Sequence, residues 1–320
     1  MRRARVWTTL LLATAALIGG CSDSTPAPDE RGVYSEPPLP AKAIPVGTDT
    51  PVPPRGGEQC GDPTASLRPS TASGPTIAAI RARGRLVVGL DAGSNLFSFR
   101  DPLTGRIVGF DADIAREIAR DLLGDPDLIE YRSLASEERE RALQDHTVDL
   151  IAKTMTITCE RRQRVAFSTV YLRADQRVLA VKNSGINGLA DLAGKRVCVA
   201  RGTTSLDHIR RDQPAATILT VPTWADCLVV LQQRQVDAVS TDDSILAGLA
   251  AQDPYTEVVG GSISAEPYGI GIPKGDDDLV RFVNATLERI RNDGTWTRIH
   301  RRWLASLGDP PTPPAPTYQD

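Results

Sequence analysis

The fold is decided by the stretch VDLIAKTMTITCER, residues 148–161. Its apolar first half, Val148–Ala152, is short and rich in branched residues, which indicates a buried strand. The hydroxyl-rich turn that follows ends on Arg161, just beyond the carboxyl end of that strand, where open α/β sheets bind small ligands. A guanidinium matches a carboxylate with a planar fork of donors. The stretch therefore predicts a carboxylate-binding site, and the alternative is a surface salt bridge for Arg161 with ordinary turn chemistry for the threonines.

The same stretch resembles a family signature. Met155–Thr158 followed by Glu160 and Arg161 is similar to the "ITIT-x-ER" motif of extracytoplasmic solute-binding proteins for polar amino acids, which serve as receptors of ATP-driven importers. Other marks of that family follow in the same order: LVVGLD (86–91), GFDADI (109–114), VDAVSTD (236–242) and GTWTRIHRRW (294–303). The resemblance spans about residues 85–305 and is strongest to the glutamine- and glutamate-binding members.

The resemblance implies a two-lobed α/β fold of the periplasmic-binding-protein-like type II. Each lobe is expected to hold a mixed sheet flanked by helices, and two chain crossings near 175–180 and 266–270 are expected to form the hinge. Strand and helix patterns alternate through this region, which favours the same fold class. We expect lobe 1 at residues 77–176 and 269–308, lobe 2 at 177–268, and a disordered tail at 309–320.

The N-terminus has the pattern of a bacterial lipoprotein signal. Residues 1–20 combine three early arginines with the apolar run Leu10–Ile18, too short to span a membrane, and end on Gly-Gly. The next residue, Cys21, resembles the lipidated cysteine of a lipobox, which implies an extracytoplasmic protein held on the outer face of the cell membrane. The alternative is an ordinary exported protein with a chance cysteine. Residues 21–76 are rich in Pro, Gly and Ser and are predicted to form an extended tether.

Charge and cysteine content narrow the function classes. The chain carries 37 Lys and Arg against 40 Asp and Glu, a formal charge of −3, so nothing indicates binding to nucleic acid. Beyond Cys21, an even number of cysteines in an exported chain suggests two disulfides. We favour Cys198–Cys227 because both lie in the same predicted lobe, which leaves Cys60–Cys159. No Cys or His spacing indicates a metal, and no cofactor is expected.

The resemblance also implies how an amino acid is bound. Arg161 is expected to pair with the α-carboxylate, helped by the amide and hydroxyl of Thr156 and by the amide of Thr204. The carbonyl of Thr154 and the carboxylate of Asp242 are expected to take the α-ammonium. Contacts drawn from both lobes would favour hinge closure on the ligand. From the residues alone, the turn at residues 202–205 can be a plain N-cap by Thr or Ser, which is compatible with the binding role, and the alternative for Asp242 is an N-cap of the helix that follows.

The residues expected near the ligand's side chain are Asp91, Ser94, Ser136, Lys153 and Arg201. Ser94 stands where the family carries an aromatic residue that stacks on the ligand. Lys153 precedes the binding turn, where glutamine-binding members have a small apolar residue. A buried ammonium needs a partner, so Lys153 favours glutamate or aspartate over asparagine and glutamine. Pairing of Lys153 with a carboxylate of the protein itself is the alternative.

The sequence thus predicts a monomeric, membrane-anchored receptor that delivers glutamate, aspartate, asparagine or glutamine to an ABC permease. A sensor that reports amino-acid levels to a membrane signalling partner would use the same cleft, and the residues do not separate the two. A cyclic-acid dehydratase on this fold would need a general acid in the cleft. Only Glu160 and Asp91 offer one, so we expect no enzymatic activity.

Overall fold

The structure is a computed structural model that describes residues 36–47 and 60–320. The predicted signal peptide and Cys21 lie outside the described residues. The chain divides into two units, Met1–Pro38 and Leu39–Asp320, and all described helices and strands belong to the second. Among the described residues, no helix is long and apolar enough to cross a membrane.

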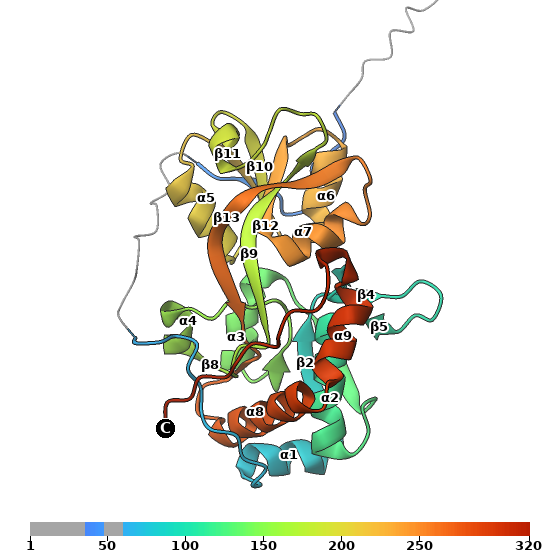
Figure 1. The fold of residues 1–320 in the computed structure, drawn as a ribbon, viewed down its shortest axis with the longest axis vertical. Helices are drawn as coiled ribbons and strands as arrows, with labels where there is room; N and C mark the ends of the chain where they lie inside the picture. Colours follow the sequence, from blue (N-terminus) through green and yellow to red (C-terminus); the bar gives the residue numbers. More distant parts are fainter. Residues whose placement is uncertain (1–35, 48–59) are drawn as a thin grey trace, which may run out of the picture. The chain divides into compact units, whose positions relative to one another are not determined.

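Lobe 1 is built on a five-stranded mixed sheet (Figure 1). The inner strand β2 (Leu86–Leu90) is buried along its whole length, as expected of a strand covered on both faces. It pairs in parallel with its two neighbours, while the strand next to the far edge runs antiparallel. In order across the sheet the strands are β6 (Ile129–Ser133), β2, β7 (Leu150–Ile151), β14 (Gly271–Pro273) and β8 (Val165–Phe167). A small three-stranded sheet adjoins it, made of β3 (Gly93–Ser94), β4 (Ser98–Arg100) and β5 (Ile107–Val108).

Lobe 2 is built on a six-stranded sheet. Its middle strands run parallel, and the strands toward both edges are antiparallel to their neighbours. In order they are β1 (Ile44–Pro45), β11 (Thr217–Val221), β10 (Arg196–Ala200), β12 (Ala238–Asp242), β9 (Leu172–Val181) and β13 (Thr256–Tyr268).

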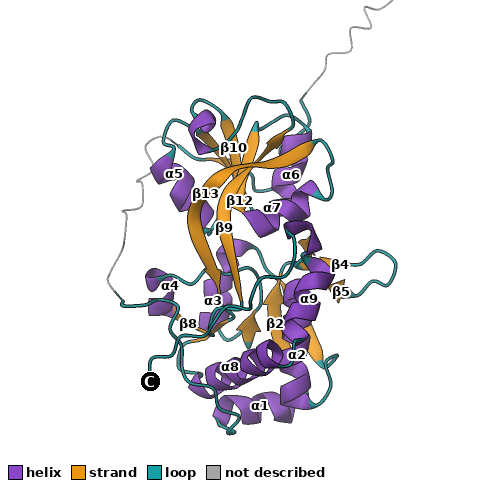
Figure 2. Ribbon diagram, in the orientation of Figure 1, coloured by secondary structure: helices purple, strands orange, loops and turns teal. Residues whose placement is uncertain are grey.

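Helices flank both sheets (Figure 2). Lobe 1 has α1 (Pro75–Arg83), α2 (Phe110–Leu123), α3 (Arg139–Gln144), α4 (Cys159–Arg164), α8 (Asp277–Asn292) and α9 (Thr295–Trp303). Lobe 2 has α5 (Thr204–Asp212), α6 (Trp224–Gln232) and α7 (Asp243–Ala250). Short 3₁₀ turns lie at η1 (Ser136–Glu138), η2 (Leu189–Leu192) and η3 (Ala305–Leu307). The larger apolar cores are separate, one in each lobe.

Helix α2 shows how local sequence sets these elements. Phe110, Ile114, Ile118 and Leu122 recur every fourth residue and are buried, which makes one apolar helix face. Gly124 ends the helix in the left-handed conformation that glycine adopts without strain. The GFDADI motif thus packs as a helix start on the core of lobe 1.

The long strands β9 and β13 join the two lobes and run side by side between them (Figure 1). Leu172 at the start of β9 and Tyr268 at the end of β13 belong to the core of lobe 1. Val178 and Leu179, further along β9, belong to the core of lobe 2. A strand pair shared by two separate cores is the geometry of a two-crossing hinge.

The predicted tether is more ordered than its composition suggests. β1 forms an antiparallel pair with β11 at the edge of the lobe 2 sheet, and Val46 donates its amide to the carbonyl of Ile218 at 2.9 Å. The composition predicted an extended tether because prolines and small polar residues bury little apolar surface. Main-chain hydrogen bonds, which do not depend on that composition, hold the described residues in place.

Residues 309–320 were predicted to be disordered, but the structure shows them held by contacts with lobe 1. Tyr318 bridges in parallel to Ser66, and the Ser66 amide donates to the carbonyl of Thr317 at 2.9 Å. The terminal Asp320 forms an ion pair with Arg281 of α8. The C-terminal segment therefore lies against lobe 1, and along its course it lines a cavity of about 1080 Å³ beside the hinge strand β9.

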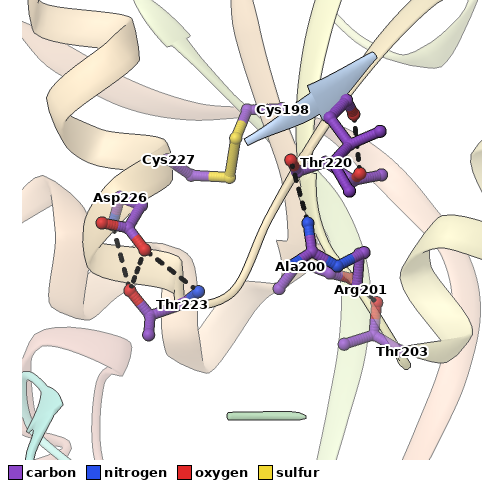
Figure 3. Close-up of a disulfide and its surroundings, with 9 residues drawn as sticks. Cys198, Ala200, Arg201, Thr203, Thr220, Thr223, Asp226 and Cys227 are labelled. Atoms are coloured by element: carbon purple, nitrogen blue, oxygen red, sulfur yellow. Dashed lines mark hydrogen bonds between the residues drawn. A yellow bond between two sulfur atoms is a disulfide. The ribbon is translucent and has the colours of Figure 1, made fainter. Parts of the chain in front are cut away.

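Two disulfides join the predicted pairs, Cys198–Cys227 and Cys60–Cys159. The first ties β10 to α6 and stands beside the start of that helix (Figure 3). There Thr223 and Asp226 form a capping box: the Asp226 carboxylate accepts from the amide and hydroxyl of Thr223.

Candidate functional site

The two lobes meet around a small enclosed cavity of about 10 Å³. That volume is near the smallest that holds one water molecule, so an amino acid enters only if the lobes move apart. Side chains of both lobes line it: Arg139, Thr154, Thr156, Arg161, Thr203, Thr204, Ser205, Trp224, Thr241, Asp242 and Ile245. The five residues predicted to bind the amino-acid backbone, Arg161, Thr156, Thr154, Thr204 and Asp242, are all among them.

Arg161 is held at the start of α4 by the turn that precedes it. The Thr158 hydroxyl accepts the Arg161 amide at 3.2 Å and caps the helix. The buried guanidinium donates to the carbonyl of Thr156 at 2.8 Å and, across the lobes, to the carbonyl of Gly202 at 3.1 Å. Its Nε lies 3.4 Å from the Glu140 carboxylate. The Thr156 and Glu140 contacts lie within lobe 1, so they hold the side chain in place whether the lobes are closed or open.

Thr154 holds a backbone conformation that side chains disfavour. Its φ of 38° lies in the left-handed region, where a branched residue is strained. The fully buried Asp111 of the GFDADI motif accepts the Thr154 amide at 3.0 Å and the Tyr171 hydroxyl at 2.7 Å. Burial raises the pKa of Asp111 to about 7, against the lowering effect of these two donors. Asp111 of this motif thus holds the binding turn in place through its hydrogen bond with the Thr154 amide.

Asp242 follows directly from the sheet as the last residue of β12. One carboxylate oxygen accepts the hydroxyl of Tyr268 at 2.5 Å, and the other is buried with no hydrogen-bond partner in the described part of the chain. Burial is the main cause that raises the pKa of Asp242 well above its usual value, and the neighbouring Glu266 adds to it. A buried, unsatisfied carboxylate oxygen is costly on its own, and a ligand ammonium would satisfy it.

Arg139 is the residue of the cavity that sequence reasoning missed. Only 3% of it is exposed. Its guanidinium donates to the main-chain carbonyls of Ser136 at 2.9 Å and Lys153 at 3.0 Å, and across the lobes to Gly202 at 3.1 Å. No carboxylate of the described residues forms an ion pair with it. Burial, together with the adjacent Arg161, lowers the pKa of Arg139 to about 9. A charged residue on a short polar helix gives no signal of burial, so the sequence alone did not identify it.

None of the five residues predicted near the ligand's side chain is among the residues that line the cavity. Lys153 is buried but lies 3.2 Å from the Asp91 carboxylate, so the alternative of a pair within the protein holds. Ser94 is buried in β3 and pairs with Ser98 across to β4. Arg201 forms an ion pair with Glu137 across the lobes at 3.0 Å. The charges of Lys153 and Arg201, which were expected to select the ligand, are thus paired with carboxylates of the protein itself.

The comparison with known proteins agrees with this geometry. Residues 86–306 match the bacterial extracellular solute-binding proteins, family 3. The ABC transporter glutamine-binding protein GlnH of Bacillus subtilis is 37% identical over 230 residues, which cover 72% of this chain and 84% of that protein. The glutamate-binding protein GluB of Corynebacterium efficiens is 32% identical over 228 residues, covering 68% and 77%.

Solved structures show the same two-lobed fold. An ancestral arginine-binding protein bound to glutamine superposes with a TM-score of 0.65 at 35% identity, covering 69% of this chain and 98% of the other. The solute receptor for L-cysteine of Neisseria gonorrhoeae gives a TM-score of 0.69 at 28% identity, covering 73% and 95%. The matched family and these relatives are binding proteins, not enzymes. Since the family match covers most of the chain, this chain belongs to the family 3 bacterial extracellular solute-binding proteins.

Proposed function

We propose that this protein is an extracytoplasmic receptor that binds an acidic L-amino acid, glutamate or aspartate, and delivers it to an ABC importer. The observation that carries the proposal is the set of charges around the interlobe cavity. Arg139 and Arg161 are buried cations there, and Asp242 is a buried anion. An acidic amino acid carries the complement of that set, two carboxylates and one ammonium.

Each charge then has a role that its geometry supports. Arg161 and the amides of Thr156 and Thr204 bind the α-carboxylate, while Asp242 and the carbonyl of Thr154 bind the α-ammonium. Arg139 takes the role first given to Lys153 and binds the side-chain carboxylate. Asparagine and glutamine lack that second carboxylate, so they would leave the Arg139 charge buried without a counter-charge, which is unfavourable.

The importer as partner rests on the relatives. GlnH of Bacillus subtilis is named as the binding protein of an ABC transporter, and its 37% identity over 230 residues of this chain favours the same use. Closure is the signal that a permease reads, because the ligand contacts both lobes and so stabilises the closed form. We propose that the two lobes comprise residues 77–176 with 269–308, and 177–268.

Membrane attachment is the second part of the proposal. The Gly-Gly-Cys sequence at residues 19–21 supports cleavage before Cys21 and attachment of lipid to it. Expression of the full chain and of Cys21→Ala in a bacterial host tests this. The unchanged chain is expected in the membrane fraction and the variant in the medium or periplasm. Equal membrane retention of the two would contradict lipid anchoring.

Calorimetric titration of the protein with each common L-amino acid tests the ligand assignment. We expect glutamate or aspartate to bind most tightly. Arg161→Ala is expected to weaken that binding by about a hundredfold or more, because it removes a charge-assisted carboxylate contact worth about 3 kcal/mol. Arg162→Ala is the matched control, since Arg162 contacts the carbonyl of Pro63 and does not line the cavity. Equal effects of the two variants would argue against the assignment.

The role of Arg139 is tested by the selectivity of Arg139→Gln. We expect this variant to lose about tenfold or more in affinity for glutamate and to bind glutamine at least as well as before. An unchanged ratio of the two affinities would show that Arg139 does not read the side chain. Tight binding of a basic amino acid by the unchanged protein would overturn the choice of an acidic ligand.

A further inference from the structure

The end of strand β13 forms a layer behind the ligand cavity. Ser264, Glu266 and Tyr268 alternate along the strand and therefore point to the same face. Beyond its pairing with β9, the strand also holds the binding turn: Thr156 bridges to Tyr268, and the Ile157 amide donates to the carbonyl of Pro267 at 2.8 Å. The hinge strand and the binding turn thus form one hydrogen-bonded unit.

Glu266 is the buried charge of this layer and is only 1% exposed. One carboxylate oxygen accepts the hydroxyl of Thr156 from lobe 1 at 2.7 Å and the hydroxyl of Thr204 from lobe 2 at 2.8 Å. The other oxygen accepts the Ser264 hydroxyl at 2.6 Å and lies 3.5 Å from Nε2 of His208. Glu266 does not line the cavity, but it holds two hydroxyls that do.

The distances decide where the two threonine protons point. The hydroxyl oxygens of Thr156 and Thr204 lie 3.4 Å apart, which is long for a hydrogen bond between hydroxyls. Their distances to Glu266 are typical of such bonds. A hydroxyl has a single proton to donate, and an ionised carboxylate only accepts. Both protons therefore point toward Glu266, and both oxygens present lone pairs to the cavity.

We propose that Glu266 is a positioning residue that sets ligand specificity. It accepts hydrogen bonds from the hydroxyls of Thr156 and Thr204, so these hydroxyls can only accept hydrogen bonds from the ligand. They therefore select a ligand with an α-ammonium over one with an α-hydroxyl. The inference rests on the proposed function. It corrects the role first given to the Thr156 hydroxyl, which cannot donate to the α-carboxylate while it donates to Glu266. The carboxylate is left to Arg161 and the main-chain amides.

As a consequence, the group on the ligand's α-carbon faces several hydrogen-bond acceptors and must donate several hydrogen bonds. Asp242, the carbonyl of Thr154 and the two threonine hydroxyls all act as acceptors. An ammonium offers three protons to these four acceptors, whereas a hydroxyl offers a single proton and leaves more of the buried acceptors unpaired. In Glu266→Gln the side-chain amide can donate to a threonine oxygen and turn that hydroxyl proton into the cavity.

The test measures amino-acid against hydroxy-acid binding in the full chain. L-Glutamate is titrated beside L-2-hydroxyglutarate, and L-aspartate beside L-malate, with the unchanged protein and with Glu266→Gln. We expect Glu266→Gln to reduce the ratio of amino-acid to hydroxy-acid affinity at least tenfold. Glu257→Gln makes the same chemical change at an exposed position of the same strand and is expected to leave the ratio unchanged.

Two further variants keep the test decisive if Glu266→Gln does not fold. Thr156→Val and Thr204→Val remove the acceptors themselves and are expected to lower the same ratio, while Thr156→Ser, which keeps the hydroxyl, restores it. An unchanged ratio in Glu266→Gln, or in both valine variants, overturns the inference while amino-acid binding stands. Failure of the unchanged protein to bind either amino acid overturns the proposed ligand class and the inference with it.

Discussion

Asp242 has a buried carboxylate at the ligand cavity, and one of its two oxygens has no hydrogen-bond partner among the described residues. Tyr268 and Glu266 of β13, Asp243 of α7 and Arg139 of α3 are the charged and titratable groups around it. Because burial and the Glu266 carboxylate raise its pKa in the ligand-free protein, Asp242 keeps its proton up to a higher pH than an ordinary aspartate does. A bound ammonium favours the ionised form and lowers that pKa again.

Amino-acid binding is therefore expected to release a proton, and affinity is expected to rise with pH up to the raised pKa of Asp242. Calorimetry in phosphate and in Tris, which differ in ionisation enthalpy, measures the proton directly. Asp242→Asn should bind more weakly and lose the Asp242 share of the release. A binding enthalpy that is the same in both buffers would contradict the linkage.

Lys153 and Asp91 form the buried ion pair that the sequence left open. Lys153→Met removes one partner and leaves Asp91 uncompensated, so we expect the free energy of unfolding to fall by about 3–5 kcal/mol. Lys153→Met combined with Asp91→Leu should recover most of that loss. Urea denaturation measures both, and the ratio of glutamate to glutamine affinity should stay as it was. A change of that affinity ratio in the double variant would indicate that Lys153 contacts the ligand's side chain after all.

At the scale of elements, the two disulfides close chain loops of very different length, and one of them holds the helix that carries Arg161. Cys159 opens α4, which carries Arg161, and Cys60 precedes α1. Cys198 and Cys227 are 29 residues apart, and Cys60 and Cys159 are 99 apart. In the loop-entropy account, a longer closed loop removes more freedom from the unfolded chain.

We expect Cys198→Ala with Cys227→Ala to lower the free energy of unfolding by about 3–4 kcal/mol, and Cys60→Ala with Cys159→Ala to lower it by roughly 1 kcal/mol more. Guanidinium denaturation of the two double variants measures the difference. Because the Arg161 guanidinium is also held by two carbonyl oxygens, amino-acid affinity should change little in either. If the Cys198/Cys227 variant lost more stability than the Cys60/Cys159 variant, loop length would not be the main determinant of how much each disulfide stabilises the fold.

At the scale of the whole of residues 39–320, the two lobes touch closely on either side of the cavity. In lobe 2, Gly248 of α7 accepts the Asn95 side-chain amide of lobe 1 at 2.9 Å. A Cβ atom at Gly248 would lie 2.5 Å from the Asn95 carbonyl oxygen. Within the helix itself alanine is favoured over glycine, so the conflict exists only while the lobes are closed.

Gly248→Ala is therefore expected to favour the open form without weakening the fold. Amino-acid affinity should fall about tenfold or more, because the closed form that binds tightly is less populated, and thermal stability without ligand should not fall. Small-angle X-ray scattering should show a larger radius of gyration. Gly261→Ala, where a Cβ meets nothing within 4 Å, is the control. Unchanged affinity and scattering would mean that the lobes already separate freely at Asn95.

The sequence by itself determined what depends on near neighbours along the chain. The alternation of buried strands with capped helices, and the turn that leads from β7 to Arg161, arise from periodicity and capping within a few residues. Thr156, Thr204 and Asp242 were predicted as ligand contacts from the family resemblance of the motifs around them, and not from these local patterns alone.

Only the tertiary structure decided which distant groups meet. Lys153 pairs with Asp91, 62 residues away, and Glu266 accepts from Thr156, 110 residues away. Burial of Arg139 depends on the facing carbonyl of Gly202 in the other lobe. The Pro-rich segments at both ends are held by main-chain hydrogen bonds together with the Cys60–Cys159 disulfide and the Arg281–Asp320 ion pair, all with partners far away along the chain. Charge partners in a cleft are set by the packing of the lobes, and no local spacing encodes that packing.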